Sequence, residues 1–134
     1  MDRPLVRDAV ADVPSDQVHW AAADWQPQRM AELSASLIEP DVLLADTGSC
    51  LIACATTQDR LLCYLPPACV VIARVDQLAE HLPAAWATIA PRVADPAQRG
   101  EFVIVTGPSR TADIEKILIL GVHGPKRLVV ILVG

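Results

Sequence analysis

The sequence contains few aromatic side chains and no long apolar run. Phe, Trp and Tyr make up 4% of the 134 residues although 52% are hydrophobic, so aliphatic side chains must form the core. A bilayer span takes roughly 20 consecutive apolar residues, and the start, MDRPLVRDAVADV, carries charges where a secretory signal is apolar. We therefore expect a cytoplasmic protein, with no membrane contact, that folds as a single domain over residues 1–134.

Positive charge is also scarce. Eleven basic and 16 acidic residues give a net charge of −5, which opposes binding to nucleic acid, because that affinity depends on neutralising phosphates. The glycine motifs GxGxxG and GxxxxGK[ST] are both absent, so dinucleotide and P-loop nucleotide sites have no support.

Four cysteines, Cys50, Cys54, Cys63 and Cys69, occur without a CxxC pair and without histidines at zinc-finger spacing. Cysteines that ligate iron-sulfur clusters are usually more closely spaced. We expect four free thiols buried as small hydrophobic side chains, in a protein that binds no metal or other cofactor directly.

Apolar runs and their breaks predict the elements of the first hundred residues. The predicted strands lie at 18–20, 42–45, 50–55 and 69–73, with a turn at 46–49 between the second and the third. A helix is predicted at 27–37 and a short one at 60–65. Two further helices within 76–90 divide at Pro83, Asp76 is the N-cap of the first of them, and an exposed loop follows at 91–100. The strands at 42–45 and 50–55 show no polar alternation, which is typical of a hairpin buried on both faces.

The C-terminal third predicts a strand at 102–105, a polar loop at 106–111, a helix at 112–121 and a strand at 128–133. This βαβ pattern implies parallel strands covered by helices, and therefore a layered α/β fold. The helix is apolar on all sides at Ile117–Leu120. A second packed element or a partner chain should cover it, so a homo-oligomer is one expectation.

The loop between the predicted strand and helix is the main candidate binding site. Ligands of α/β sheets bind at the carboxyl ends of strands, where loops present free backbone N–H groups at helix N-termini. This segment supplies hydroxyls, a flexible glycine and a guanidinium suited to a small anion. The candidate residues are Thr106, Gly107, Ser109, Arg110, Thr111 and Asp113. The alternative is that Ser109 or Thr111 only caps the helix and Arg110 pairs with nearby acids.

The turn at 46–49 is a second candidate. Thr47, Gly48 and Ser49 offer hydroxyls and backbone donors, and they join the same site if their strand end lies beside that of Val105. The alternative is a generic turn.

No catalytic residue can be assigned. The predicted helix is about 15 Å long at 1.5 Å per residue, which separates His123 from the anion loop and favours a role at the helix C-terminus over that of a general base. His19 and His81 have no acidic or nucleophilic companion in the sequence, so no triad can be argued.

Three segments resemble one known family. TGPSRTADIEKILILGVHGPKRLVVILV, ADTGSCLI and RLLCYLPPACVVIARVDQL are similar to the corresponding stretches of LUD-domain proteins of the LutC/YkgG type. The resemblance implies a NagB/RpiA/CoA-transferase-like fold, an α/β layered sandwich with a largely parallel central sheet flanked by helices. Asp46 and Ser49 stand where the family usually has Glu and Thr, and the N-terminus is shorter than is typical, which we expect to reflect a shortened LUD domain.

The resemblance also implies a function. LutC-type components act with iron-sulfur partner proteins that oxidise L-lactate to pyruvate, and the clusters belong to those partners. We expect an accessory, non-catalytic component that binds an anionic small molecule or a partner subunit. The alternatives are an enzyme of the CoA-transferase or phosphosugar type, because superfamily relatives bind such substrates, and a structural interaction module.

Overall fold

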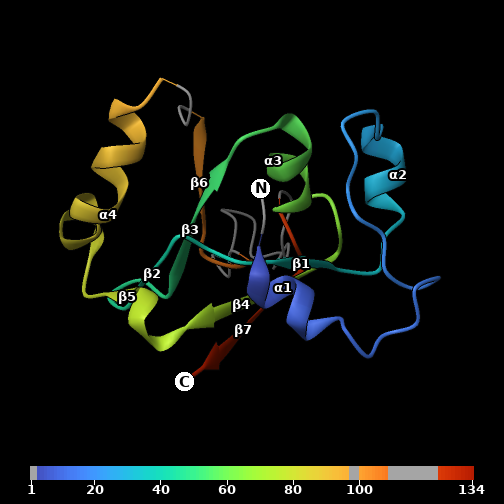
Figure 1. Ribbon diagram of the computed structural model, residues 1–134, viewed down its shortest axis with the longest axis horizontal. Helices are drawn as coiled ribbons and strands as arrows, with labels where there is room; N and C mark the ends of the chain where they lie inside the picture. Colours follow the sequence, from blue (N-terminus) through green and yellow to red (C-terminus); the bar gives the residue numbers. More distant parts are fainter. Residues whose placement is uncertain (1–2, 97–99, 109–123) are drawn as a thin grey trace, which may run out of the picture.

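The computed structural model describes residues 3–96, 100–108 and 124–134, and in these residues two β-sheets are flanked by helices (Figure 1). The helices are α1 (Pro4–Ala9), α2 (Pro27–Ala31), α3 (Thr57–Leu62) and α4 (Leu82–Ala94), with a 3₁₀ turn, η1 (Val75–Gln77). The strands are β1 (Ser36–Ile38), β2 (Val42–Leu44), β3 (Ser49–Cys54), β4 (Ala68–Arg74), β5 (Leu78–Ala79), β6 (Glu101–Val105) and β7 (Arg127–Val133).

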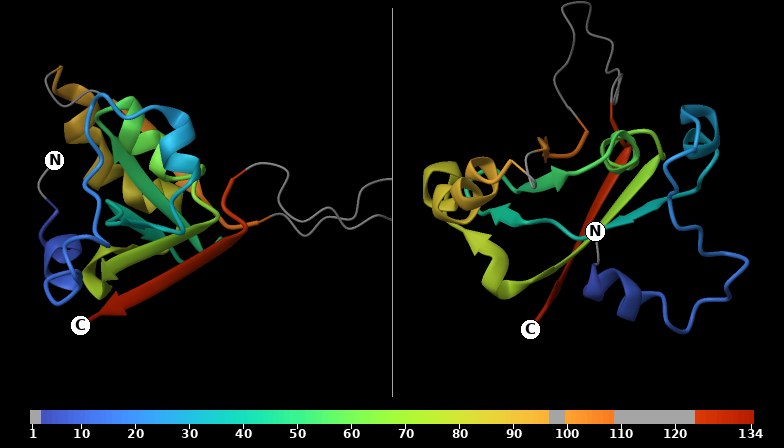
Figure 2. Two further views of the ribbon diagram at one scale, coloured as in Figure 1. Left: turned by 90° about the vertical axis from the view of Figure 1, so that its right-hand side faces the viewer. Right: turned by 45° about the horizontal axis from the view of Figure 1, so that its top comes forward.

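One sheet has three strands and the other has four. The first, in the order β1-β4-β7, is parallel throughout, and β7 lies alongside β4 at its edge (Figure 2). The second has the order β5-β2-β3-β6, with a parallel β5–β2 pair and antiparallel β2–β3 and β3–β6 pairs. The predicted α/β class with a largely parallel sheet is confirmed, as is the hairpin around residues 46–49.

The main core lies between the two sheets. Successive side chains of a strand point to opposite faces, so each sheet contributes alternate residues. The buried members of this inter-sheet core are Leu43, Cys50, Ile52, Cys54, Cys63, Cys69, Val71, Ala73 and Val105. All four cysteines are buried and free, as expected.

The helices cover the remaining faces. The other side of the β2–β3 hairpin, including Leu51, packs against Ala85 and Ile89 of α4. Met30 of α2 packs against Leu61 of α3, and α1 contacts β4. Within residues 3–96, 100–108 and 124–134, no helix combines the length and the apolarity needed to cross a membrane.

Two predictions near the N-terminus are wrong. Residues 18–20 form no strand. The helix expected at 27–37 ends at Ala31, and Ser36–Ile38 forms β1. This segment pairs in parallel with β4, where Leu37 lies beside Val70, and this tertiary pairing overrides the local helical spacing.

The segment from Asp76 to Ala94 also differs from expectation. The first predicted helix is replaced by η1 and β5, and β5 pairs with β2. Asp76 is not the N-cap of a helix here, because the Asp76 carboxylate binds the Arg74 guanidinium. Pro83 occupies an early position of α4, as predicted, and His81 caps that helix by accepting a hydrogen bond from the Ala84 N–H. The helix then continues past Pro91 into the segment predicted as a loop.

The two strands of the predicted βαβ unit do not share a sheet. β6 pairs with β3 in the four-stranded sheet, whereas β7 pairs with β4 in the three-stranded sheet. Local periodicity identifies both strands but contains no information about which sheet each one joins. The helix predicted at 112–121 lies outside the described residues.

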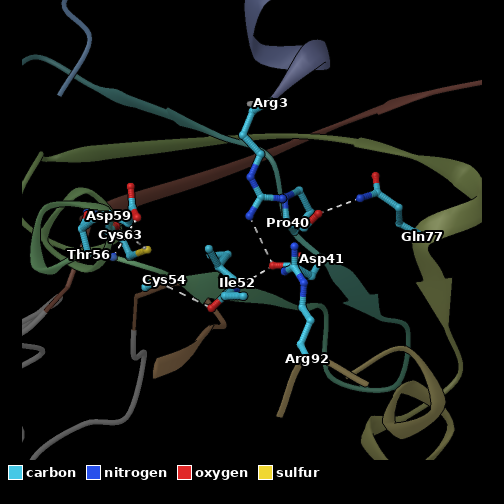
Figure 3. A network of polar contacts seen from close by, with 11 residues as sticks. Arg3, Pro40, Asp41, Ile52, Cys54, Thr56, Asp59, Cys63, Gln77 and Arg92 are labelled. Atoms are coloured by element: carbon cyan, nitrogen blue, oxygen red, sulfur yellow. Dashed lines mark hydrogen bonds and ion pairs between the residues drawn. The ribbon is translucent and has the colours of Figure 1, made fainter. Parts of the chain in front are cut away.

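A partly buried carboxylate joins three distant segments (Figure 3). The side chain of Asp41 is 10% exposed and accepts a hydrogen bond from the Ala53 N–H at 2.6 Å. It also forms ion pairs with Arg3, at 3.5 Å, and with Arg92 of α4. Asp41 therefore ties the N-terminal segment and α4 to β3.

The inter-sheet core predicts a contrast between two isoleucines. Ile52 is 3% exposed and Ile104 is 48% exposed, and they lie on paired strands. We expect Ile52→Ala to lower the free energy of unfolding by about 2–5 kcal/mol, because it leaves a cavity, and Ile104→Ala to lower it by less than about 1 kcal/mol. Urea denaturation of both variants measures this, and equal losses would contradict the burial assignment.

The Asp41 cluster predicts a second contrast. Asp41→Asn keeps a carbonyl oxygen for the Ala53 N–H but removes the charge that holds both arginines, and we expect a loss of about 1–3 kcal/mol in unfolding free energy. Asp76→Asn is the matched control, since Asp76 and Arg74 are 63% and 61% exposed and solvent screens their pairing. Equal denaturation midpoints for Asp41→Asn and the wild type would show that the cluster is not stabilising.

Candidate functional site

The register of β3 and β6 brings the two predicted binding segments together. Cys50 pairs with Val105 in this antiparallel ladder, so the start of β3 lies beside the end of β6. The Ser49 Oγ and Thr106 Oγ1 atoms are 2.9 Å apart, which makes a hydrogen bond between residues 57 positions apart in the chain. The adjacency that the sequence left open is therefore present.

This hydroxyl pair retains hydrogen-bonding capacity. Each hydroxyl carries one proton, and the bond between Ser49 and Thr106 uses only one of the two. Ser49 is 3% exposed, whereas Thr106 is exposed. When Ser49 donates, the exposed Thr106 hydroxyl keeps its own proton for an acceptor at this edge, such as the oxygen of a carboxylate or phosphate.

The residues beside the hydroxyl pair leave the backbone exposed at the same edge. Thr47 and Gly48 are exposed, and Gly48 has φ +65 with nothing within 4 Å of the position that a Cβ would occupy. The N–H of Asp46 donates to the Glu80 carbonyl oxygen at 3.1 Å. This hydrogen bond anchors the turn at 46–49 to the residue that follows β5. Gly107, at φ +103, adopts a conformation that side chains disfavour.

The other predicted site residues lie outside the described part of the chain. They are Ser109, Arg110, Thr111 and Asp113. His123 and the apolar stretch Ile117–Leu120 fall in the same undescribed segment. Of the predicted site, the structure therefore places Thr47, Gly48, Ser49, Thr106 and Gly107, and it brings Ser49 and Thr106 into contact.

Sequence reasoning did not find the cavities of the fold. One, of about 200 Å³, is lined by residues of α1, β1, β3 and α3 and by Arg3, Trp20 and Glu39 outside these elements. Another, of about 190 Å³, is lined by Cys54, Ala55, Thr56, Thr57, Arg60, Gly100 and Glu101. Each gathers residues that are distant in the sequence, so no local motif marks it. Neither is lined by the Ser49–Thr106 pair.

Comparison with known proteins identifies the family. The LUD domain model matches residues 5–133. The chain belongs to the LUD domain family. A lactate utilization protein C of Bacillus pumilus is 34% identical over 107 residues, which cover 78% of this chain and 45% of that protein. The uncharacterized protein YkgG of Escherichia coli is 31% identical over 124 residues, or 84% of this chain and 52% of that protein.

A solved structure supports the fold of this LUD domain chain. The crystal structure of a DUF162 family protein from Deinococcus radiodurans matches with a TM-score of 0.62 at 19% identity, covering 98% of this chain and 81% of that one. The likeness confirms the mixed α/β architecture. The chain spans about half the length of the curated relatives that it matches.

The hydroxyl pair predicts a specific energetic coupling. Thr106→Val leaves the buried Ser49 hydroxyl without its partner, which should lower the unfolding free energy by about 1–3 kcal/mol. Ser49→Ala should lower it by about 1 kcal/mol, and the double variant should be less destabilised than the sum of the two. A double-mutant cycle by urea denaturation measures the coupling, and strictly additive losses would exclude the bond.

Proposed function

We propose that this LUD domain chain is an accessory component of a cytoplasmic L-lactate utilisation system. In this proposal it binds a small anion at the edge where β3 begins and β6 ends, and iron-sulfur partner proteins carry out the oxidation of lactate to pyruvate. The observation that carries the proposal is the Ser49–Thr106 hydroxyl pair. It brings together two segments that both resemble LUD-domain proteins.

The chemistry of the edge supports a small carboxylate as ligand. The free proton of the hydroxyl pair is a donor for one carboxylate oxygen. The exposed turn at Thr47 and Gly48 permits close approach of a ligand, because a residue without Cβ leaves the backbone accessible. Lactate and pyruvate both carry a carboxylate beside a second oxygen, which suits a site with more than one donor.

The names of the relatives support the metabolic setting. The Bacillus pumilus protein and a Bacillus licheniformis protein, which is 30% identical over 118 residues, are both lactate utilization protein C. A role in lactate utilisation is accordingly the function that the relatives favour.

The sequence adds Arg110 to the proposed site. Its guanidinium would supply the positive charge that a hydroxyl pair lacks, and a planar fork matches both oxygens of a carboxylate.

Ligand binding tests the proposal directly. In thermal unfolding, L-lactate or pyruvate should raise the Tm of the wild type, because a ligand at about 100 times its Kd adds about 2.7 kcal/mol to stability. Thr106→Val and Arg110→Ala should each weaken binding about tenfold or more, the loss of about 1.4 kcal/mol or more. Arg74→Ala is the matched control, because Arg74 is exposed and binds Asp76.

The outcomes separate the competing functions. Stabilisation by a CoA thioester or a sugar phosphate, with turnover, would replace the proposal with the transferase-type enzyme. Stabilisation by none of these ligands would remove the binding role. Undiminished growth on L-lactate after deletion of the gene would remove the metabolic role.

A further inference from the structure

The outer edge of β7 is unpaired in the part of the chain that the structure describes. β7 is the last strand in the order β1-β4-β7, and its seven residues pair with β4 along their whole length. Figure 2 shows the strand at the side of its sheet. A strand that pairs on one side only presents a row of backbone N–H and C=O groups on the other, and this row can pair with a further strand.

The side chains of this edge strand are apolar and exposed. Val129, Val130, Ile131 and Leu132 are 39%, 41%, 45% and 53% exposed, and they lie alternately on the two faces of the sheet. No charged residue, proline or glycine interrupts the strand after Arg127. A parallel strand whose sequence is a continuous apolar run is normally buried on both faces. The exposure of β7 therefore indicates that another chain segment covers this edge.

The other edges of the two described sheets lack this combination. β1 and β5 have only three and two residues. β6 has five residues and begins with the charged Glu101, and Ile104 alone among its apolar residues is exposed. Short length and charge are the usual protection of edge strands against pairing with another chain. Among the described strands, β7 is thus the one edge without such protection.

A second copy of the chain fits this edge in length, polarity and symmetry. A two-fold axis perpendicular to the sheet makes the two β7 strands antiparallel and maps each face of the sheet onto the same face. Because successive side chains point to opposite faces, paired residues must then lie an even number of positions apart. An axis at Val130 pairs the whole strand, with Arg127 of one copy opposite Val133 of the other.

This register places apolar side chains opposite one another and keeps like charges apart. Leu128 of one copy lies opposite Leu132 of the second copy. Val129 lies opposite Ile131 on the other face, and aliphatic pairs of this kind stabilise a sheet. The two Arg127 side chains lie at opposite ends of the ladder, about 20 Å apart at roughly 3.3 Å per residue. Because each copy has one such edge, the pairing closes at two chains.

We propose that the chain forms a two-fold symmetric dimer in which the β7 strands of two copies pair antiparallel about Val130. The three-stranded sheets of the two copies then form one continuous sheet across the interface. The dimer uses neither Ser49 nor Thr106, so the inference goes beyond the proposed anion site and does not depend on it.

Sedimentation equilibrium of the wild-type chain tests the dimer. The expected result is a concentration-dependent species of twice the 14.4 kDa chain mass. Val130→Lys puts two like charges opposite each other at the axis and should raise the dissociation constant about tenfold or more. Ile104→Lys is the matched control, because Ile104 is 48% exposed on the edge of the other sheet, and it should leave the constant unchanged. A monomeric wild type, or equal weakening by both variants, would overturn the proposal.

A mixture of Val130→Lys and Val130→Glu tests the register, with the fold of each variant checked by circular dichroism. Each variant alone should be mainly monomeric, because its own charge faces an identical charge at the axis. The mixture should recover a dimer that contains one copy of each, because the two charges are then opposite. A mixture that stays as monomeric as its components would place Val130 away from the axis and contradict the proposed pairing.

Discussion

The pairing of β3 on both of its edges is the constraint on which the rest of the structure depends. The strand binds β2 on one side and β6 on the other, and its two faces belong to different cores. Ile52 faces the inter-sheet core, whereas Leu51 faces α4. A slip of one residue would exchange these faces, so the register is fixed by burial. The contact between Ser49 and Thr106 follows from that register.

The two ends of β3 have different surroundings. At its start, Ser49 meets Thr106 and an exposed turn, which suits recognition of an oxygen-rich anion. At its end, the buried Cys54 borders a cavity of about 190 Å³. The Asp41 carboxylate holds the middle of the strand through the Ala53 N–H. The same strand thus connects the proposed anion-binding edge to a cavity at its opposite end.

Local patterns in the sequence predicted much of this structure, and long-range pairing set the limit. Continuous apolar runs identified β3 and β4, and turn-forming residues identified the hairpin between β2 and β3. β1 and β5 were missed because Leu37 and Leu78 also fit the helical spacing of neighbouring apolar residues, whereas pairing with β4 and β2 decides their conformation. For the same reason the sequence named Ser49 and Thr106 as candidates but did not establish their contact, which depends on the β3–β6 register.

The most direct test of the account is a titration of isotopically labelled protein with L-lactate, followed by amide chemical shifts in NMR spectra. If the anion binds where β3 begins and β6 ends, the largest shifts will belong to Thr47, Gly48, Ser49, Thr106 and Gly107, while the amides around Cys54 stay unchanged. Shifts concentrated instead around Arg3, Trp20 and Glu39, which line the 200 Å³ cavity, would place the ligand elsewhere and contradict the account.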